Sequence, residues 1–141
     1  MRGQFGEKLL PQCLVDLTES AFLKDLAEAQ RRHPSVVDDL MDAFAALEGS
    51  FALGDWIPGL GAHVRNLRIG VKQEGIEKRK GYCLIYVVDL ETSPAIVAPI
   101  LFKYRPEMPS VPPEEIANVL REMVKRQAEL EAHFSPPNSI Q

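Results

Sequence analysis

The stretch that decides the fold runs from residue 54 to residue 105 and reads GDWIPGLGAHVRNLRIGVKQEGIEKRKGYCLIYVVDLETSPAIVAPILFKYR. Glycine and proline make its first residues a turn, and apolar and polar side chains then alternate at 66–71, which predicts a half-buried strand. Two continuous apolar runs at 82–90 and 96–104 are rich in Val, Ile and Tyr and predict paired strands at the centre of a sheet. Pro99 cannot donate to the hydrogen-bond ladder, so we expect an edge position or a bulge there.

Helical patterns flank this stretch. On its N-terminal side, a strand at 12–17 leads into a helix capped by Thr18 or Ser20, and a capping box at Ser35 opens a second helix that ends at Gly49. So short a break between two helices predicts an antiparallel α-hairpin. The expected buried stripe of the second helix comprises Val37, Leu40, Met41, Phe44 and Leu47.

The C-terminal side begins with two prolines and two glutamates at 112–115. Proline fits the first turn of a helix and acids match the positive end of its dipole, so a last helix is expected to start there. The chain is therefore expected to have an α+β fold, a small antiparallel twisted sheet with an N-terminal α-hairpin and a C-terminal helix packed on it. A single domain over 12–131 is expected, with flexible ends at 1–11 and 132–141.

The composition suits one soluble globular protein. The chain has 141 residues, of which 45% are hydrophobic, and this is enough for a sizeable core. Cys13 and Cys83 are each flanked by apolar residues, so we expect two buried thiols rather than a disulfide or a zinc site. No run approaches the ~20 apolar residues of a membrane helix, and we expect a cytoplasmic protein without a membrane partner.

The charge is unevenly distributed along the chain. Residues 56–106 hold eight Lys or Arg against four Asp or Glu, whereas the chain as a whole has a net charge of −4. A protein that meets phosphate in one place only needs such a locally positive field, although a solvated strand face gives the same composition.

Three motifs, in this order, are GDWIPGLG at 54–61, VRNLRI at 64–69 and KGYCLIY at 80–86. Together they resemble the RelE/ParE superfamily of toxins from type II toxin–antitoxin systems. In the branch that the chain resembles most, a "gd-x-iPG-x-G" turn precedes a "K-v-R" strand. A basic loop with a "G-Y-R-v-I-Y" strand follows, and a later strand ends in a "Y-x-K" tip. The similarity covers roughly residues 15 to 125, and the expected element order agrees with the family fold.

The resemblance implies a ribosome-dependent mRNA endonuclease that inhibits translation. In that reaction the 2′-hydroxyl of the RNA attacks the adjacent phosphate without a metal or cofactor, helped by a base, by cations and by a donor for the leaving oxygen. The partners implied are a cognate antitoxin, the ribosome and mRNA, and a homodimer is left open. Carried over by position, the catalytic residues are Arg68, Lys103, Tyr104 and Arg105, and the RNA-binding residues are Arg65, Lys78, Arg79, Lys80 and Tyr82.

The chain departs from the family pattern at three cation positions. Asn66 stands in place of a lysine and Cys83 in place of an arginine, and Tyr104 replaces the tip lysine unless Lys103 or Arg105 takes over. Removing one transition-state donor costs ~2.7–4 kcal/mol in other enzymes. Two alternatives therefore stay open. One is a degenerate or ParE-like member that binds a protein, such as gyrase or an antitoxin, without cutting RNA, and the other is a general RNA-binding or regulatory domain.

Two side chains near the first turn admit two interpretations each. Trp56 is expected to be a lid on the core rather than a base-stacking platform. His63 is isolated in the sequence and is expected to be a solvated or hydrogen-bonded side chain rather than a general base.

Overall fold

The computed structural model describes residues 12–134. The chain divides into two compact units, one that ends at Val111 and one that begins at Pro112, and each is described by itself. The flexible N-terminus expected at 1–11 lies outside the described residues, as do residues 135–141 of the expected tail. Residues 132–134 belong to the last helix.

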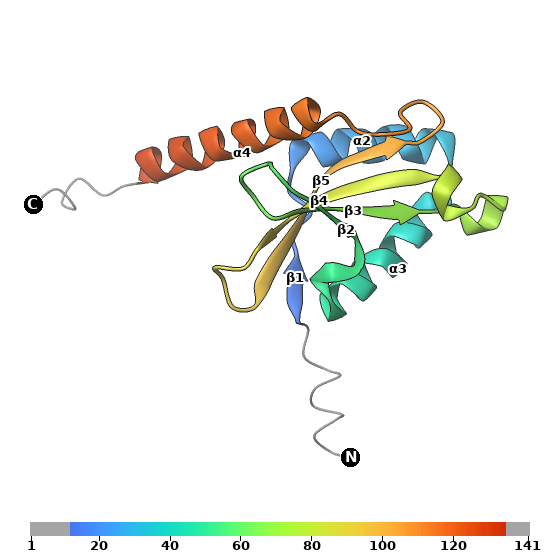
Figure 1. The fold of residues 1–141 in the computed structure, drawn as a ribbon, viewed down its shortest axis with the longest axis horizontal. Coiled ribbons are helices and arrows are strands. Elements are labelled where there is room, and N and C mark those ends of the chain that lie inside the picture. The colour runs from blue at the N-terminus through green and yellow to red at the C-terminus, as the bar shows by residue number, and fades with distance from the viewer. Residues whose placement is uncertain (1–11, 135–141) are drawn as a thin grey trace, which may run out of the picture. The chain divides into compact units, whose positions relative to one another are not determined.

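Five strands form one sheet in the first unit, in the spatial order β1-β5-β4-β3-β2 (Figure 1). Strands β2 to β5 form an antiparallel meander, whereas β1 runs parallel to β5. The α+β class is confirmed, but the expectation of an antiparallel sheet is wrong at this edge, where the sheet is mixed. A parallel neighbour needs a long crossover, which the chain between the two strands provides. The bounds are β1 Cys13–Val15, β2 Asp55–Ile57, β3 Val64–Ile69, β4 Tyr82–Asp89 and β5 Ala95–Tyr104.

The two apolar runs form β4 and β5 and pair with each other, as predicted. Their register shifts between Ile85, which faces Leu101, and Tyr86, which faces Pro99, so β5 has one extra residue there. A bulge at Pro99 is therefore confirmed, and its position agrees with the missing N–H of proline.

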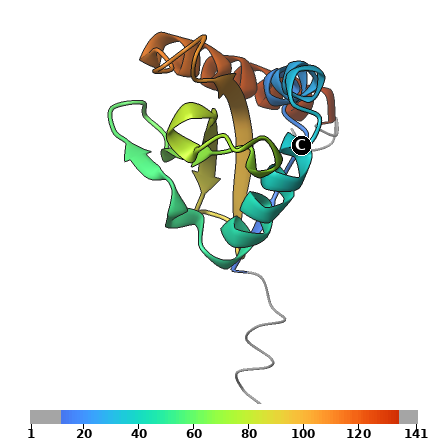
Figure 2. The same cartoon turned by 90° about the vertical axis from the view of Figure 1, so that its right-hand side faces the viewer.

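Two helices, α2 (Ser20–Arg32) and α3 (Val36–Gly49), form the predicted hairpin. α2 contacts β5, while α3 contacts β1 and β3, and Figure 2 shows α3 lying along one side of the sheet. The predicted cap of α2 is wrong, since its N-cap is Glu19. Ser35 is the N-cap of α3 as predicted, but its hydroxyl makes no capping hydrogen bond and is buried without a partner among the described residues. The end at Gly49 is confirmed.

The core lies between these helices and the sheet. Alternate residues of β4 face the helices, and the rings of Phe22 and Phe44 meet edge to face at 6.2 Å. Met41 was expected in the buried stripe of α3 but is 58% exposed, because Val36 fills the first buried turn and shifts the stripe. The buried residues that make up the core are Cys13, Phe22, Ala29, Val36, Leu40, Phe44, Leu47, Ile69, Val71, Tyr82, Leu84, Tyr86, Val88, Val97 and Phe102.

Two short 3-10 turns, η2 (Lys72–Glu74) and η3 (Lys78–Lys80), form the loop between β3 and β4, and a third, η1 (Phe51–Leu53), follows α3. The loop folds back tightly on the end of β3. A Cβ at Gly81 would collide with the backbone carbonyl of Ile69, so glycine is required where the basic loop enters β4. The second unit contains α4 (Pro113–Phe134), which opens with proline and two glutamates as predicted.

Candidate functional site

The ends of β3, β4 and β5 bring several of the predicted site residues together. The register aligns Arg68 with Cys83 and Cys83 with Lys103, so these three side chains leave the same face of the sheet. The next residues along, Ile69, Tyr82 and Tyr104, form a parallel row on the opposite face. The predicted catalytic residues are therefore split between two faces.

Lys103 is held by an internal ion pair. Its Nζ lies 3.0 Å from Oδ1 of Asp25 on α2, and the other carboxylate oxygen of Asp25 accepts the backbone N–H of Phe102 at 2.9 Å. Asp25 is only 6% exposed and the Lys103 side chain 23%. The carboxylate thus accepts a backbone N–H at the open edge of β5 and also holds the Lys103 ammonium in place.

Tyr104 packs against the end of α2. The guanidinium of Arg32 lies 4.4 Å from the centre of its ring, in a cation–π geometry, and Arg32 also forms an ion pair with Glu107 at 2.6 Å. The ring of His33 lies 5.3 Å away on the same side. Tyr104 therefore contributes its ring to packing at this corner.

Tyr82 is buried in the same aromatic corner. Its hydroxyl lies 2.9 Å from Nδ1 of His33, and its ring stacks on Phe102 at 4.5 Å. Burial raises the pKa of the Tyr82 hydroxyl, and the nearby guanidinium of Arg32 opposes that rise. A side chain that is 1% exposed cannot stack on an RNA base, so the position expected to bind RNA is occupied by core packing.

Arg68 and Arg105 are the two expected catalytic cations next to Cys83, Arg105 by contact and Arg68 by strand register. Arg105 Nη1 lies 3.6 Å from the sulfur of Cys83, and Arg68 is the β3 neighbour of the same cysteine. Arg68 is exposed and Arg105 is half-buried, and neither is paired with a carboxylate of residues 12–134. The backbone N–H of Arg105 donates to Gly81 O at 2.8 Å, which places this corner next to Lys80. The Arg105 guanidinium thus lies beside the buried thiol, and the exposed Arg68 leaves the same face of the sheet from the neighbouring strand.

Arg65 is used inside the fold. It donates from Nε to Nε2 of His63 at 2.9 Å and from Nη1 to the carbonyl of Gly54 at 2.6 Å. Burial, with a smaller contribution from the Arg65 charge, lowers the pKa of His63 and keeps that imidazole a neutral acceptor. The Tyr86 hydroxyl fastens the same turn, since it donates to Phe51 O at 2.7 Å and accepts from Gly54 N at 2.9 Å. The arginine therefore holds the entry to β2 in place.

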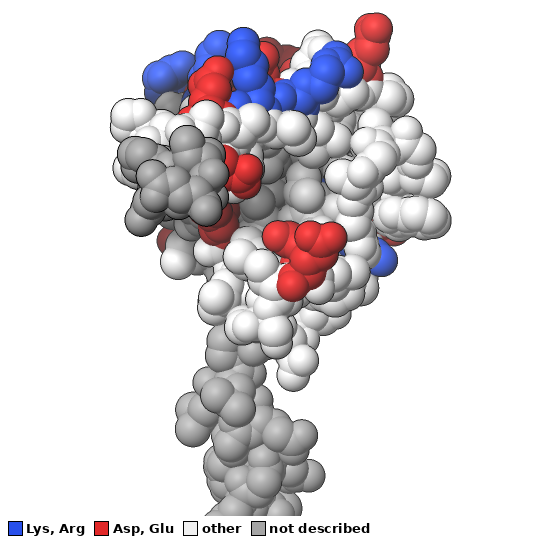
Figure 3. Space-filling view, turned by 90° about the vertical axis from the view of Figure 1, so that its left-hand side faces the viewer, with Lys and Arg blue, Asp and Glu red and all other residues white. Residues whose placement is uncertain are grey.

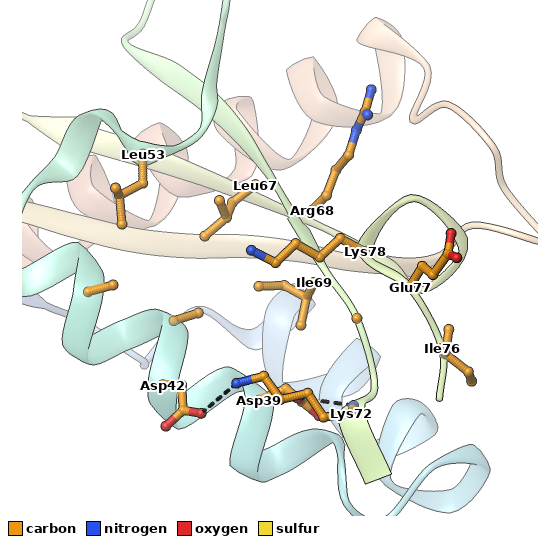
Figure 4. Close-up of a pocket in the computed structure, with 13 residues that line it drawn as sticks. Asp39, Asp42, Leu53, Leu67, Arg68, Ile69, Lys72, Ile76, Glu77 and Lys78 are labelled. Carbon is orange, nitrogen blue, oxygen red and sulfur yellow. Dashed lines mark hydrogen bonds and ion pairs between the residues drawn. The ribbon is translucent and has the colours of Figure 1, made fainter. Parts of the chain in front are cut away.

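The basic loop presents its three cations differently. Arg79 forms an ion pair with Glu77 at 2.9 Å, and Lys80 is exposed next to the start of β4. Lys78 turns toward a groove between the sheet and α3 (Figure 4). Only part of the expected RNA-binding set is thus available to a ligand on the sheet face of Arg68.

The sequence did not indicate this groove, which we call the α3–β3 groove. It has a volume of about 600 Å³ and an apolar floor. In Figure 4, Leu53, Leu67 and Ile69 point into the space above α3, whereas the guanidinium of Arg68 points away from it. The only signal in the sequence is a pair of small residues on α3, because alanines leave room where larger side chains would fill the gap. The side chains that form the floor are Ala43, Ala46, Leu53, Leu67, Ile69 and Ile76.

Trp56 does not cover the core. It is 61% exposed on the edge strand β2, beside a shallow hollow of about 410 Å³ that also involves His63 and Arg65. The expectation of a lid is therefore wrong, because β2 pairs with β3 at the edge of the sheet, where no further strand covers the indole among the described residues. Figure 3 shows another face of the molecule, on which carboxylates lie near the centre of a mostly uncharged surface.

Both cysteines are free and buried, as predicted. The Cys13 thiol lies 2.8 Å from Leu47 O, and burial raises its pKa. Within residues 12–134, no three His, Cys, Asp or Glu side chains gather closely enough to hold a metal ion. None of the described helices has the length and hydropathy to cross a membrane.

Comparison of the chain with protein-family models, with curated proteins and with solved structures finds no match in any of the three.

Proposed function

We propose that this chain is a RelE/ParE-like member of a toxin–antitoxin system that acts by binding a protein partner without cleaving RNA. Its support begins with the element order, in which one strand, a helical hairpin, an antiparallel meander and a C-terminal helix follow one another. This order agrees with what the sequence resemblance implies, and such agreement concerns the fold rather than the chemistry.

The observation that favours binding over cleavage is that the residues at the end of β5 are already used in contacts within the fold. Lys103 is held by Asp25, and Tyr104 lies under Arg32 on the other face of the sheet. Asn66 and Cys83 stand at two more positions where the family has cations, and Asn66 Oδ1 is buried without a partner among the described residues. Of the expected catalytic cations, only Arg68 and Arg105 lack a carboxylate partner within residues 12–134, and the group beside Arg105 is the buried Cys83 thiol.

The surface that suits a protein partner is the β2 edge. β2 has three residues and ends the sheet, so its outer backbone groups are open to strand addition. Trp56 lies on this strand with 61% of its surface exposed, and tryptophan is enriched at the centres of interfaces. A partner strand that pairs with β2 would cover this indole.

A second candidate is the mRNA endonuclease itself, favoured by Arg105, which contacts Cys83, and by Arg68, which is the β3 neighbour of that cysteine. Guanidinium groups grip phosphate through two parallel hydrogen bonds and stabilise the charge that develops during attack by the 2′-hydroxyl. In this version the base and the leaving-group donor come from the RNA, the ribosome or a partner.

Expression in cells separates the two candidates. Protein and DNA synthesis are followed by pulse labelling, and mRNA ends are mapped. Under the proposed function, no new mRNA ends form on ribosomes, and Arg68→Ala changes nothing. Cleaved mRNA that disappears in Arg68→Ala and in Arg105→Ala, but persists in Arg79→Ala, would establish the endonuclease instead.

The binding itself is tested with the product of the small reading frame next to that of this chain, if it encodes a DNA-binding antitoxin, and with gyrase. Calorimetry should show a complex that Trp56→Ala weakens about 30-fold or more, as expected for an interface hot spot worth about 2 kcal/mol. Leu90→Ala is the matched control, since this side chain is 55% exposed at the β4–β5 turn, away from β2. Equal loss in both variants, or no binding to either protein, would refute the proposal.

A further inference from the structure

The α3–β3 groove has the size and lining of a small-molecule site. Its volume of about 600 Å³ falls within the range of roughly 300–1,000 Å³ that is typical of ligand pockets. Its floor is apolar, and Ala43 and Ala46 of α3 keep it open opposite Leu67 and Ile69 of β3. Such a floor favours a ligand with a flexible or flat hydrocarbon body.

Three carboxylates and three cations line the groove, and the carboxylates are already engaged. On the α3 side, Asp39 accepts the backbone N–H of Lys72 at 3.3 Å, and Asp42 lies 3.7 Å from the Lys72 ammonium (Figure 4). On the loop side, Glu77 is paired with Arg79. Asp42 and Glu77 are therefore each paired with a cation, whereas Asp39 accepts a backbone N–H.

Lys78 is the exception at this rim. Its side chain extends over the groove between Leu67 and Ile69 in Figure 4, and no hydrogen bond or ion pair within residues 12–134 involves its ammonium. A single ammonium next to an apolar floor matches a monoanion with a hydrocarbon tail. Arg68 also lines the groove, but its planar guanidinium, the group that favours phosphate, points away from the apolar floor in Figure 4.

We propose that the α3–β3 groove binds a medium-chain fatty acid, with the hydrocarbon tail on the apolar floor and the carboxylate at the Lys78 ammonium. The apolar floor of this site faces α3, away from the Arg68 guanidinium, and the proposal does not depend on the proposed function. Because a buried methylene raises affinity about fourfold, affinity should rise with chain length until the floor is covered.

The experiment uses the full chain and titrates octanoate, decanoate and decanol, each below the concentration at which it forms micelles. Backbone amide shifts are followed by NMR. We expect saturable binding, shifts that cluster at α3, β3 and the β3–β4 loop, and decanoate tighter than octanoate by about 16-fold for two methylenes. Decanol should bind more weakly than decanoate.

Three variants test the assignment. Lys78→Met should weaken decanoate about three- to tenfold, whereas Lys80→Met, the same change two residues away and outside the lining, should leave it unchanged. Ala46→Leu fills the floor and should abolish binding, and the wild-type shift map decides the question if that variant does not fold. Absence of saturable binding, shifts centred elsewhere, or equal affinity for decanoate in wild type and Lys78→Met would overturn the proposal.

Discussion

Replacing Asp25 by alanine should lower the free energy of unfolding by about 3 kcal/mol. Asp25 lies on α2, and its carboxylate contacts β5. The carboxylate has two tasks, since it accepts the Phe102 N–H at 2.9 Å and binds the Lys103 ammonium at 3.0 Å. The loss of an acceptor for a buried N–H costs about 1–3 kcal/mol, and removal of one partner from a buried ion pair costs about 3–5 kcal/mol. Because one carboxylate supplies both interactions and water reaches part of the lysine, we take the lower end of the ion-pair range, about 3 kcal/mol.

Urea unfolding followed by circular dichroism measures this change. With a slope of about 1.5 kcal/mol per molar urea, a loss of about 3 kcal/mol moves the midpoint down by about 2 M. Asp25→Asn should cost less, because the amide oxygen still accepts the N–H. A double-mutant cycle with Lys103→Met should return a coupling of about 1–3 kcal/mol.

The control is Glu107→Ala, which breaks the ion pair to Arg32. That pair is shorter, at 2.6 Å, but its side chains are 32% and 64% exposed, so its loss should cost no more than about 1 kcal/mol. If Glu107→Ala is as costly as Asp25→Ala, or if Asp25→Ala costs less than about 1 kcal/mol, burial does not decide the strength of these pairs and the reasoning fails.

Tyr86→Phe should lower the free energy of unfolding by about 1–3 kcal/mol, because it leaves two backbone groups of the turn before β2 without their hydrogen-bond partner. Tyr104→Phe should be nearly neutral. Urea unfolding of both variants measures the difference. Gly81→Ala should destabilise strongly through its clash with the β3 backbone, while Gly49→Ala, with nothing within 4 Å of its added Cβ, should be neutral or slightly stabilising in a thermal melt. The pKa of His63 is lowered in the folded state, so the unfolded chain binds the proton more readily and stability should fall as the pH drops below about 6.5. That loss between pH 7.5 and pH 5 should be smaller in His63→Gln, and an unchanged loss would contradict the assignment.

Local patterns were enough for most of the fold. The apolar runs predicted β4 and β5, and the absent N–H of Pro99 predicted the bulge between them. Alternation along β3 placed Arg68 on the polar side of its strand, where it is exposed. β2 was missed because three residues between glycines read as a turn, and its strand character comes only from pairing with β3.

The candidate site was less predictable, because its contacts join residues far apart in the chain. Nothing near Lys103 in sequence reveals that Asp25 neutralises it, and nothing near Tyr82 reveals the hydrogen bond to His33. The α3–β3 groove likewise arises only when the β3–β4 loop folds back opposite two alanines of α3. A resemblance over short motifs finds such positions but cannot tell which of them the fold already uses.

The parallel pairing of β1 with β5 has a consequence for synthesis on the ribosome. Cys13 is among the first described residues to leave the exit tunnel, yet its strand partner Ala95 follows only after the helices and three strands. At translation speeds of about 5–20 residues per second, the first strand waits on the order of 4–16 s for its neighbour. During this delay the apolar edge of the first strand is open to chaperones and proteases, and the sheet is complete only once β5 has emerged.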